Sequence, residues 1–196
     1  MSTALRKDED GKYTYTDYAA WNDDKRYELV DGVAYAMAGP GVAHQRISRK
    51  LLRKIDEHLD TKDCEVFSAP FDVRLNTNKD DDTVLQPDLL VICNPDKISD
   101  GKSCNGAPDL VIEILSPPNT FHDRVRKLKK YKEAGVKEIW FAEPNEGFVE
   151  VLVRRGDAYD MDGFDKTEQV PVDILPGLVI DLSDIFEVPK NAEESL

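Results

Sequence analysis

Two short apolar segments, residues 84–93 and 109–115, place the strongest constraint on how this chain can fold. Neither segment alternates apolar with polar side chains, which is typical of strands buried on both faces. Each also contains acids, Asp88 in the first and Asp109 and Glu113 in the second. A buried carboxylate is costly unless a charged group lies beside it. Because a helix rich in Lys and Arg follows the second segment, we expect the acids to serve a divalent metal and a phosphate.

The order of the remaining patterns predicts an α/β fold, with a central mixed β-sheet flanked by helices. The expected elements are a short helix and Asp-Gly hairpin over 13–38, a helix over 43–59, a strand over 64–75 kinked at Pro70, a long loop over 94–108, a helix over 120–134 with Thr120 and Asp123 as a capping box, and strands over 136–142 and 148–154. We expect the core to span about residues 43–155 and residues 156–196 to form a peripheral C-terminal arm. At this length a single domain of residues 1–196 is expected.

The distribution of charge limits the partners that the chain can have. A formal net charge of −13 argues against a protein that coats nucleic acid non-specifically. Basic residues nevertheless concentrate in the two long helices, so phosphates can be contacted locally. Binding to DNA would then be weak and strongly dependent on salt. The candidate DNA contacts are Arg46, Arg124, Arg126 and Lys130.

The cysteines and the hydropathy pattern predict a cytoplasmic protein. Cys64, Cys93 and Cys104 are odd in number and lack CxxC spacing, so we interpret them as reduced thiols. No apolar run approaches the length of a membrane span, and the first residues lack the apolar segment of a signal peptide. We therefore expect no membrane partner, and the sequence leaves a homodimer open.

Spacing decides which acids can act together. Asp109 and Glu113 lie four residues apart on one strand, about 13 Å, which is too far for one small cation. Asp88 and Glu113 lie on successive strands and can be cross-strand neighbours, so they are the better pair of metal ligands. The alternative is that both acids sit at strand ends, solvated or bonded to backbone amides. A lysine beside a metal could orient an attacking water, and Lys127 is the candidate, although on pattern alone a solvated helix lysine is the better interpretation.

A resemblance adds to these observations. Residues 13–187 resemble the Uma-type restriction endonuclease family of the PD-(D/E)XK nuclease superfamily. The stretches that carry the resemblance are Tyr27-Glu-Leu-Val-Asp-Gly32, Ala43-His44-Gln45, Gln86-Pro-Asp88, Pro108-Asp-Leu-Val-Ile-Glu113-Ile-Leu-Ser116, Asp123-Arg-Val-Arg-Lys127 with Tyr131, Ala134-Gly-Val-Lys-Glu-Ile-Trp140 and Pro176-Gly-Leu178.

The resemblance implies a restriction-endonuclease-like core and Mg²⁺-dependent hydrolysis of DNA phosphodiester bonds, with Mn²⁺ as a substitute ion. It implies Asp88 and Glu113 as catalytic metal ligands, and His44 and Glu28 as accessory residues. One position departs from the superfamily pattern, because Leu115 stands where a lysine is expected two residues after the second acid. The family's lysine is instead expected on the next helix, at Lys127. The rival hypothesis is a nuclease-fold module that binds a partner without cutting DNA.

Overall fold

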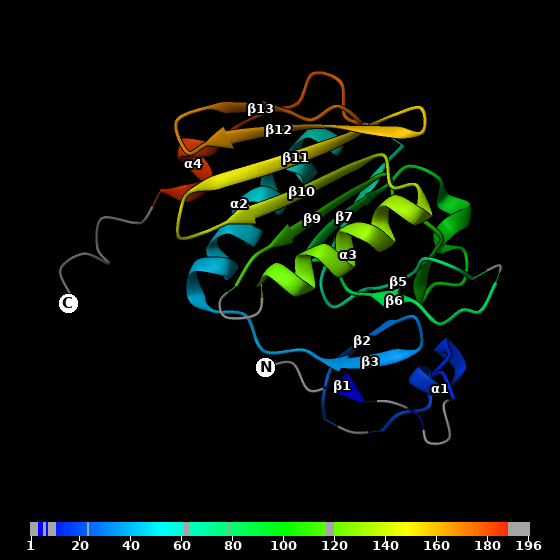
Figure 1. The fold of residues 1–196 in the computed structure, drawn as a ribbon. Coiled ribbons are helices and arrows are strands. Elements are labelled where there is room, and N and C mark those ends of the chain that lie inside the picture. The colour runs from blue at the N-terminus through cyan, green and yellow to red at the C-terminus, as the bar shows by residue number, and fades with distance from the viewer. Residues whose placement is uncertain are drawn as a thin grey trace, which may run out of the picture.

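The fold places a six-stranded sheet between two long helices and a second sheet below it (Figure 1). The computed structural model describes residues 4–5, 7, 11–22, 24–60, 63–77, 79–116 and 120–187, without the side chains of residues 4 and 120–122. The expected Thr120 cap therefore lies outside the described side chains. The helices are α1 (Tyr15–Ala19), α2 (Val42–Leu59), α3 (Thr120–Ala134) and α4 (Leu182–Phe186), with a 3₁₀ turn η1 (Pro95–Ile98).

The sequence predicted one central mixed sheet, and the structure has two six-stranded sheets, both mixed. The upper sheet has the order β12 (Ala158–Asp165), β11 (Phe148–Arg155), β10 (Glu138–Glu143), β9 (Leu110–Ile114), β7 (Leu89–Ile92) and β4 (Glu65–Ser68), with β9 and β10 parallel. The lower sheet has the order β1 (Ala4–Leu5), β3 (Val33–Ala36), β2 (Tyr27–Val30), β6 (Val84–Leu85), β5 (Asp72–Arg74) and β8 (Ser103–Asn105), with β5 and β8 parallel. A two-stranded ribbon joins β13 (Gln169–Pro171) to β14 (Val179–Asp181).

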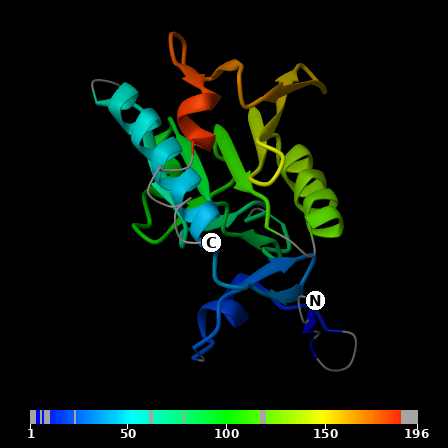
Figure 2. The same cartoon turned by 90° about the vertical axis from the view of Figure 1, so that its left-hand side faces the viewer.

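The two long helices cover opposite faces of the upper sheet (Figure 2). Helix α2 buries an apolar residue on every fourth position, from Ile47 to Leu59, against the sheet face that includes Ile112. Helix α3 packs on the other face, where Tyr131 contacts the cluster that includes Val111. Because side chains alternate along a strand, Glu113 points to the same face as Val111, towards α3.

Two segments predicted as single strands are each divided between the sheets. Residues 84–93 form β6 in the lower sheet and β7 in the upper sheet, and Pro87 lies in the break. Residues 64–75 divide in the same way into β4 and β5, around a cis peptide bond before Pro70. A proline has no N–H for a strand ladder, so pairing cannot continue through it. The first break places Asp88 where the chain passes from one sheet to the other.

The N-terminal helix and hairpin are confirmed. Thr14 caps α1, and its side chain and that of Asp17 form a capping box. Asp31 and Gly32 both have positive φ, 52° and 77°, as the central residues of a tight hairpin turn require.

Two other expectations need correction. Residues 94–108 are not an irregular loop, because they contain η1 and β8, which pairs with β5. Residues of the expected C-terminal arm are not peripheral, because β12 pairs with β11 along its whole length and residues from Val170 to Ile185 lie in the main core. That the chain is one domain stays a prediction.

The expectation of three reduced thiols is also wrong. Cys64 and Cys93 form a disulfide, and Cys104 is the buried free thiol. Strands β4 and β7 are antiparallel with Glu65 opposite Ile92, so the next residues outward are the two cysteines. The pairing follows from strand register, and the 29-residue separation in sequence gives no sign of it. None of the helices in the described part of the chain is long and apolar enough to cross a membrane.

Candidate active site

Asp88 and Glu113 lie opposite each other at the junction of the two sheets. Strands β7 and β9 are antiparallel with Leu89 opposite Ile112, so the preceding residue, Asp88, falls opposite Glu113. Directly opposed residues have Cβ atoms about 4.5–5.5 Å apart, within the reach of one ion shared by two carboxylates. The register therefore brings together the pair that the sequence selected.

Glu113 is buried and held by two donors from α3. Both of its carboxylate oxygens lie 3.1 Å from Nζ of Lys127, and the hydroxyl of Tyr131 donates to Oε1 at 2.5 Å. Burial raises the pKa of Glu113 to about 8, against the lowering effect of Lys127 and with a further increase from the nearby charges of Glu28 and Asp88. Burial thus disfavours the ionised form of Glu113, and an additional cation beside it would stabilise that form.

Lys127 joins the two sheets through its ammonium group. Its side chain is only 7% exposed, and Nζ lies 2.9 Å from Oε1 of Glu28 as well as 3.1 Å from Glu113. Burial alone would lower the pKa of Lys127, but the charges of Glu113 and Glu28 raise it well above its ordinary value. Lys127 is therefore a permanent cation in this arrangement, and it can orient a water or a phosphate oxygen rather than accept a proton.

Asp88 is fixed through one oxygen and leaves the other available. Its Oδ2 accepts the backbone N–H of Ile114 at 2.7 Å and lies 3.1 Å from Nε2 of His44 in the first turn of α2. His44 Nδ1 is buried without a hydrogen-bond partner, so we assign the ring proton to Nε2, which donates to Asp88. Oδ1 of Asp88 accepts no hydrogen bond from any residue that the structure describes. This oxygen is free to bind a ligand.

Glu28 and Gln86 form the wall of the site on the side of the lower sheet. Oε1 of Glu28 accepts the backbone N–H of Gln86 at 2.9 Å. The Gln86 side chain accepts two bonds from Arg26 and donates to Tyr18 and Asp72, at 2.7 to 3.1 Å. The wall is therefore held rigidly by a hydrogen-bond network that runs to α1. We refer to Glu28, His44, Asp88, Glu113 and Lys127 together as the junction site.

Asp109 is engaged elsewhere. Its carboxylate accepts the backbone N–H of Cys93 at 2.9 Å and pairs with Lys137 at 2.6 Å. Burial would raise the pKa of Asp109, but Lys137 and the Cys93 amide lower it below its usual value. The second Pro-Asp pair of the sequence thus secures the start of β9 and takes no part in the junction site.

The candidate DNA contacts on α3 are occupied by carboxylates of the chain itself. Arg124 pairs with Glu150, and Arg126 pairs with Asp123. Lys130 pairs with Asp31 of the N-terminal hairpin at 2.7 Å and with Glu133 of α3 at 2.9 Å. Each would have to exchange a carboxylate for a phosphate on binding DNA. Arg46 of α2 is half-buried and pairs with no acid in the described ranges.

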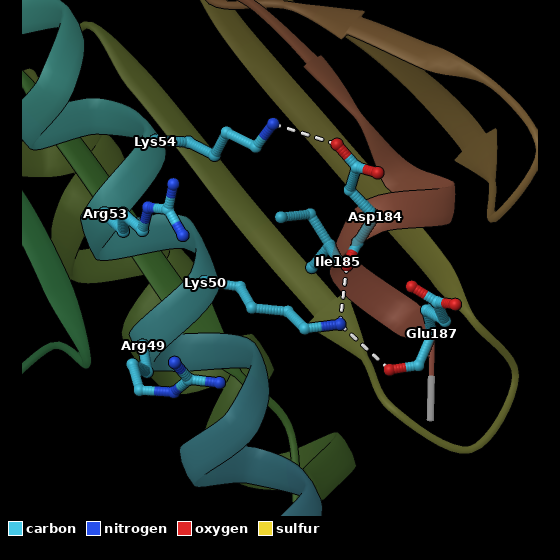
Figure 3. A pocket seen from close by; sticks show the side chains of 7 residues that line it. All are labelled: Arg49, Lys50, Arg53, Lys54, Asp184, Ile185 and Glu187. Atoms are coloured by element: carbon cyan, nitrogen blue, oxygen red, sulfur yellow. Dashed lines mark hydrogen bonds and ion pairs between the residues drawn. The ribbon is translucent and has the colours of Figure 1, made fainter. Parts of the chain in front are cut away.

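A second group of cations lies along α2, beyond its first turn. An open pocket between α2 and α4 is lined by Arg49, Lys50, Arg53, Lys54, Asp184, Ile185 and Glu187 (Figure 3). Lys50 donates to the backbone carbonyls of Asp184 and Glu187 at 2.6 and 2.9 Å, and Lys54 pairs with the Asp184 carboxylate at 2.8 Å. Lys50 thus bonds to carbonyl groups at the end of α4, and Lys54 pairs with a side chain of that helix. The contact between the two helices explains the pocket.

Comparison with known proteins identifies the family. Residues 14–183 match the model of the Uma2 family, which is described as "Putative restriction endonuclease". This match covers most of the chain. The chain belongs to the Uma2 family. An uncharacterised protein from Synechocystis is 34% identical over 124 residues, and that match spans 61% of this chain but only 62% of the relative.

A solved structure supports the fold of the Uma2 chain. A crystal structure described as "a putative nuclease belonging to DUF820", from Anabaena variabilis, aligns with a TM-score of 0.73 over 89% of this chain and 97% of the other. At 20% identity this likeness shows the fold alone. The predicted restriction-endonuclease-like α/β fold is confirmed.

The junction site has the donor chemistry for a small divalent cation. Its two opposed carboxylates would hold the ion, and water and substrate phosphates usually complete the shell of Mg²⁺. Within the described ranges no three His, Cys, Asp or Glu side chains gather closely enough to bind a metal by themselves. The residues present therefore fit a Mg²⁺ site of the open kind and do not fit a closed, all-protein cage.

The sequence assigned no role to two residues that contact the junction site. Tyr131 was noted only within a motif of the resemblance, yet its hydroxyl contacts Glu113. Its spacing of four from Lys127, which places both on one helix face, was the available signal. Gln86 was noted only within a motif, and nothing in its pattern indicated that its backbone N–H donates a hydrogen bond to Glu28.

Proposed function

We propose that this Uma2 chain is a Mg²⁺-dependent endonuclease that hydrolyses DNA phosphodiester bonds, with Mn²⁺ as a substitute. The observation that carries the proposal is the opposition of Asp88 and Glu113 in the β7–β9 register, with the Lys127 cation beside them. In this proposal Asp88 and Glu113 hold the ion, which would polarise the phosphate and lower the pKa of the attacking water.

The chain's own residues then have distinct tasks. His44 and the Ile114 amide fix Oδ2 of Asp88, which aims Oδ1 at the ion. Lys127 stays protonated, so it orients the attacking water and offsets charge on the phosphate. Arg46 is the candidate for a neighbouring backbone phosphate, because it lies on the same helix as His44 and pairs with no acid in the described ranges. Binding should be weak and sensitive to salt, given the net charge of −13.

A second candidate function is a nuclease-fold module that binds a partner without cutting. One observation favours it, namely that Lys127 and Tyr131 both bond to the carboxylate of Glu113. This pairing lowers the gain from binding a metal. The two candidate functions differ in whether the protein cuts DNA when a metal ion is present.

The test is a cleavage assay on supercoiled plasmid, linear duplex and single-stranded DNA, with Mg²⁺, Mn²⁺ or EDTA. We expect metal-dependent cleavage that falls by at least about a hundredfold in Asp88→Asn and Glu113→Gln, since both ligands act in the same step. Glu146→Gln, an exposed acid outside the site, is the matched control and should cleave like the parent chain. Cleavage that persists in the first two variants would refute the assignment, and binding of DNA without cleavage by any metal would favour the second candidate.

A further inference from the structure

Glu28 forms a buried ion pair with Lys127, although Glu28 is not one of the two proposed metal ligands. Glu28 lies on β2 of the lower sheet, Lys127 lies on α3, and their charged atoms are 2.9 Å apart. Their side chains are 5% and 7% exposed. An ammonium group has three protons, so Lys127 can bond to Glu28 and Glu113 at the same time.

Glu28 is held in place independently of Glu113. Its Oε1 accepts the backbone N–H of Gln86, and the Gln86 side chain is clamped by Arg26. These partners belong to the lower sheet and its surroundings, whereas Glu113 belongs to the upper sheet. Movement of Lys127 away from Glu113 therefore leaves its contact with Glu28 intact.

A divalent ion between Asp88 and Glu113 would repel the Lys127 ammonium. Charges a few ångströms apart interact strongly in a buried site, so the ion and Lys127 compete for Glu113. With Glu28 present, the lysine keeps one carboxylate while Glu113 turns to the ion. Without Glu28, the one carboxylate within ion-pair distance of Lys127 among the described residues would be Glu113 itself.

We propose that Glu28 is a positioning residue that holds Lys127 beside the bound metal and so releases Glu113 to the ion. This inference rests on the proposed function. The competing role for Glu28 is that of a third metal ligand. Two observations oppose that role: Oε1 already accepts bonds from Gln86 and Lys127, and among the described residues no three acidic, His or Cys side chains converge on one ion position.

The test is a double-mutant cycle read by calorimetric titration with Mn²⁺ at pH 8, in the absence of DNA. Glu28→Gln should weaken Mn²⁺ binding at least about tenfold, because Lys127 then competes for Glu113. In the Lys127→Met background the same change should weaken binding about threefold or less, because no competing cation remains. Glu28→Asp, which keeps the charge, should restore most of the affinity.

The outcomes separate this inference from the function on which it rests. An equal loss in both backgrounds would make Glu28 a metal ligand, and no loss in either would make it irrelevant to the site; both overturn the inference while the metal site stands. If the parent chain binds no Mn²⁺, the proposed function falls and the inference falls with it. If Mn²⁺ binds and the loss depends on Lys127, the inference is supported.

A second measurement covers the case in which Lys127→Met does not fold. Amine acylation followed by mass spectrometry is carried out on the parent chain and on Glu28→Gln, both with saturating Mn²⁺. Labelling of Lys127 should rise at least about threefold in the variant, because the displaced amine has lost its buried partner. Lys129, whose side chain is 69% exposed, is the internal control and should not change. Unchanged labelling of Lys127 would overturn the inference.

Discussion

Replacement of Lys127 by Met tests the electrostatics of the junction site most severely. Met has a similar unbranched stem, so the change removes the charge with little loss of packing. It leaves Glu113 and Glu28 buried without their cation, with side chains 8% and 5% exposed. Removing one partner of a buried ion pair typically costs about 3–5 kcal/mol, because the remaining charge is uncompensated.

The cost is limited by protonation, which makes it depend on pH. The pKa of Glu113 is already raised to about 8 in the parent chain, so the carboxylate left without a cation at pH 7 is mainly that of Glu28. A glutamate whose pKa is about 4.3 in the unfolded chain can take a proton at pH 7 for about 3.7 kcal/mol, and at pH 5 for about 1 kcal/mol. We therefore expect the free energy of unfolding to fall by about 3–4 kcal/mol at pH 7 and by about 1 kcal/mol at pH 5. The sign follows from linkage: a buried carboxyl whose pKa is raised on folding contributes stability below its unfolded pKa, and this is lost as the pH rises through the folded value.

The assay is urea denaturation followed by the fluorescence of Trp140, which is fully buried. Lys129→Met on the same helix is the matched control, because its lysine is 69% exposed and its pair with Glu133 spans 3.7 Å. Its cost should stay within about 0.5 kcal/mol at both pH values. The reasoning is refuted if Lys127→Met costs no more than the control at pH 7, or costs the same at pH 5 as at pH 7.

Three further predictions concern the surroundings of the site. Tyr131→Phe removes the hydroxyl that donates to Glu113 and should lower the free energy of unfolding by about 1.5–3 kcal/mol in urea titrations; a loss under about 0.5 kcal/mol would mean that the bond is weak. Reduction of the Cys64–Cys93 disulfide, which closes a separation of 29 residues, should cost about 3–4 kcal/mol, and a thiol assay of the unfolded, unreduced chain should count one free thiol rather than three. Arg46→Gln should lower the slope of log K for DNA against log salt by about 1 in anisotropy titrations, whereas an unchanged slope would exclude a phosphate contact.

The choice of Asp88 over Asp109 as the partner of Glu113 could be argued from the sequence, because four residues of extended chain keep Asp109 away from Glu113. The register that places Asp88 opposite Glu113 is set by the pairing of β7 with β9, between which β8 lies in the chain. The division of residues 84–93 between two sheets could not be predicted in the same way. Pro87 forbids continuous pairing, but the second sheet that accepts Val84 and Leu85 is assembled from strands distant in the sequence.

The position of Lys127 shows the limit of pattern reasoning. On the helix pattern alone it was indistinguishable from Lys129, Lys130 and Lys132, and only the resemblance singled it out. In the structure it is buried between carboxylates of both sheets, and one of them, Glu28 on β2, lies far from Lys127 in the chain. The Cys64–Cys93 disulfide was missed for a similar reason, since it depends on the pairing of β4 with β7.

The most direct test of the account is the position of a bound ion. Crystals of the chain soaked in Mn²⁺ would be measured at a wavelength where manganese scatters anomalously. The account predicts an anomalous peak between Oδ1 of Asp88 and the carboxylate of Glu113, with Lys127 still paired to Glu28. The assignment of the metal site would be contradicted if the protein cleaves DNA with Mn²⁺ but the anomalous peak of manganese lies away from both carboxylates.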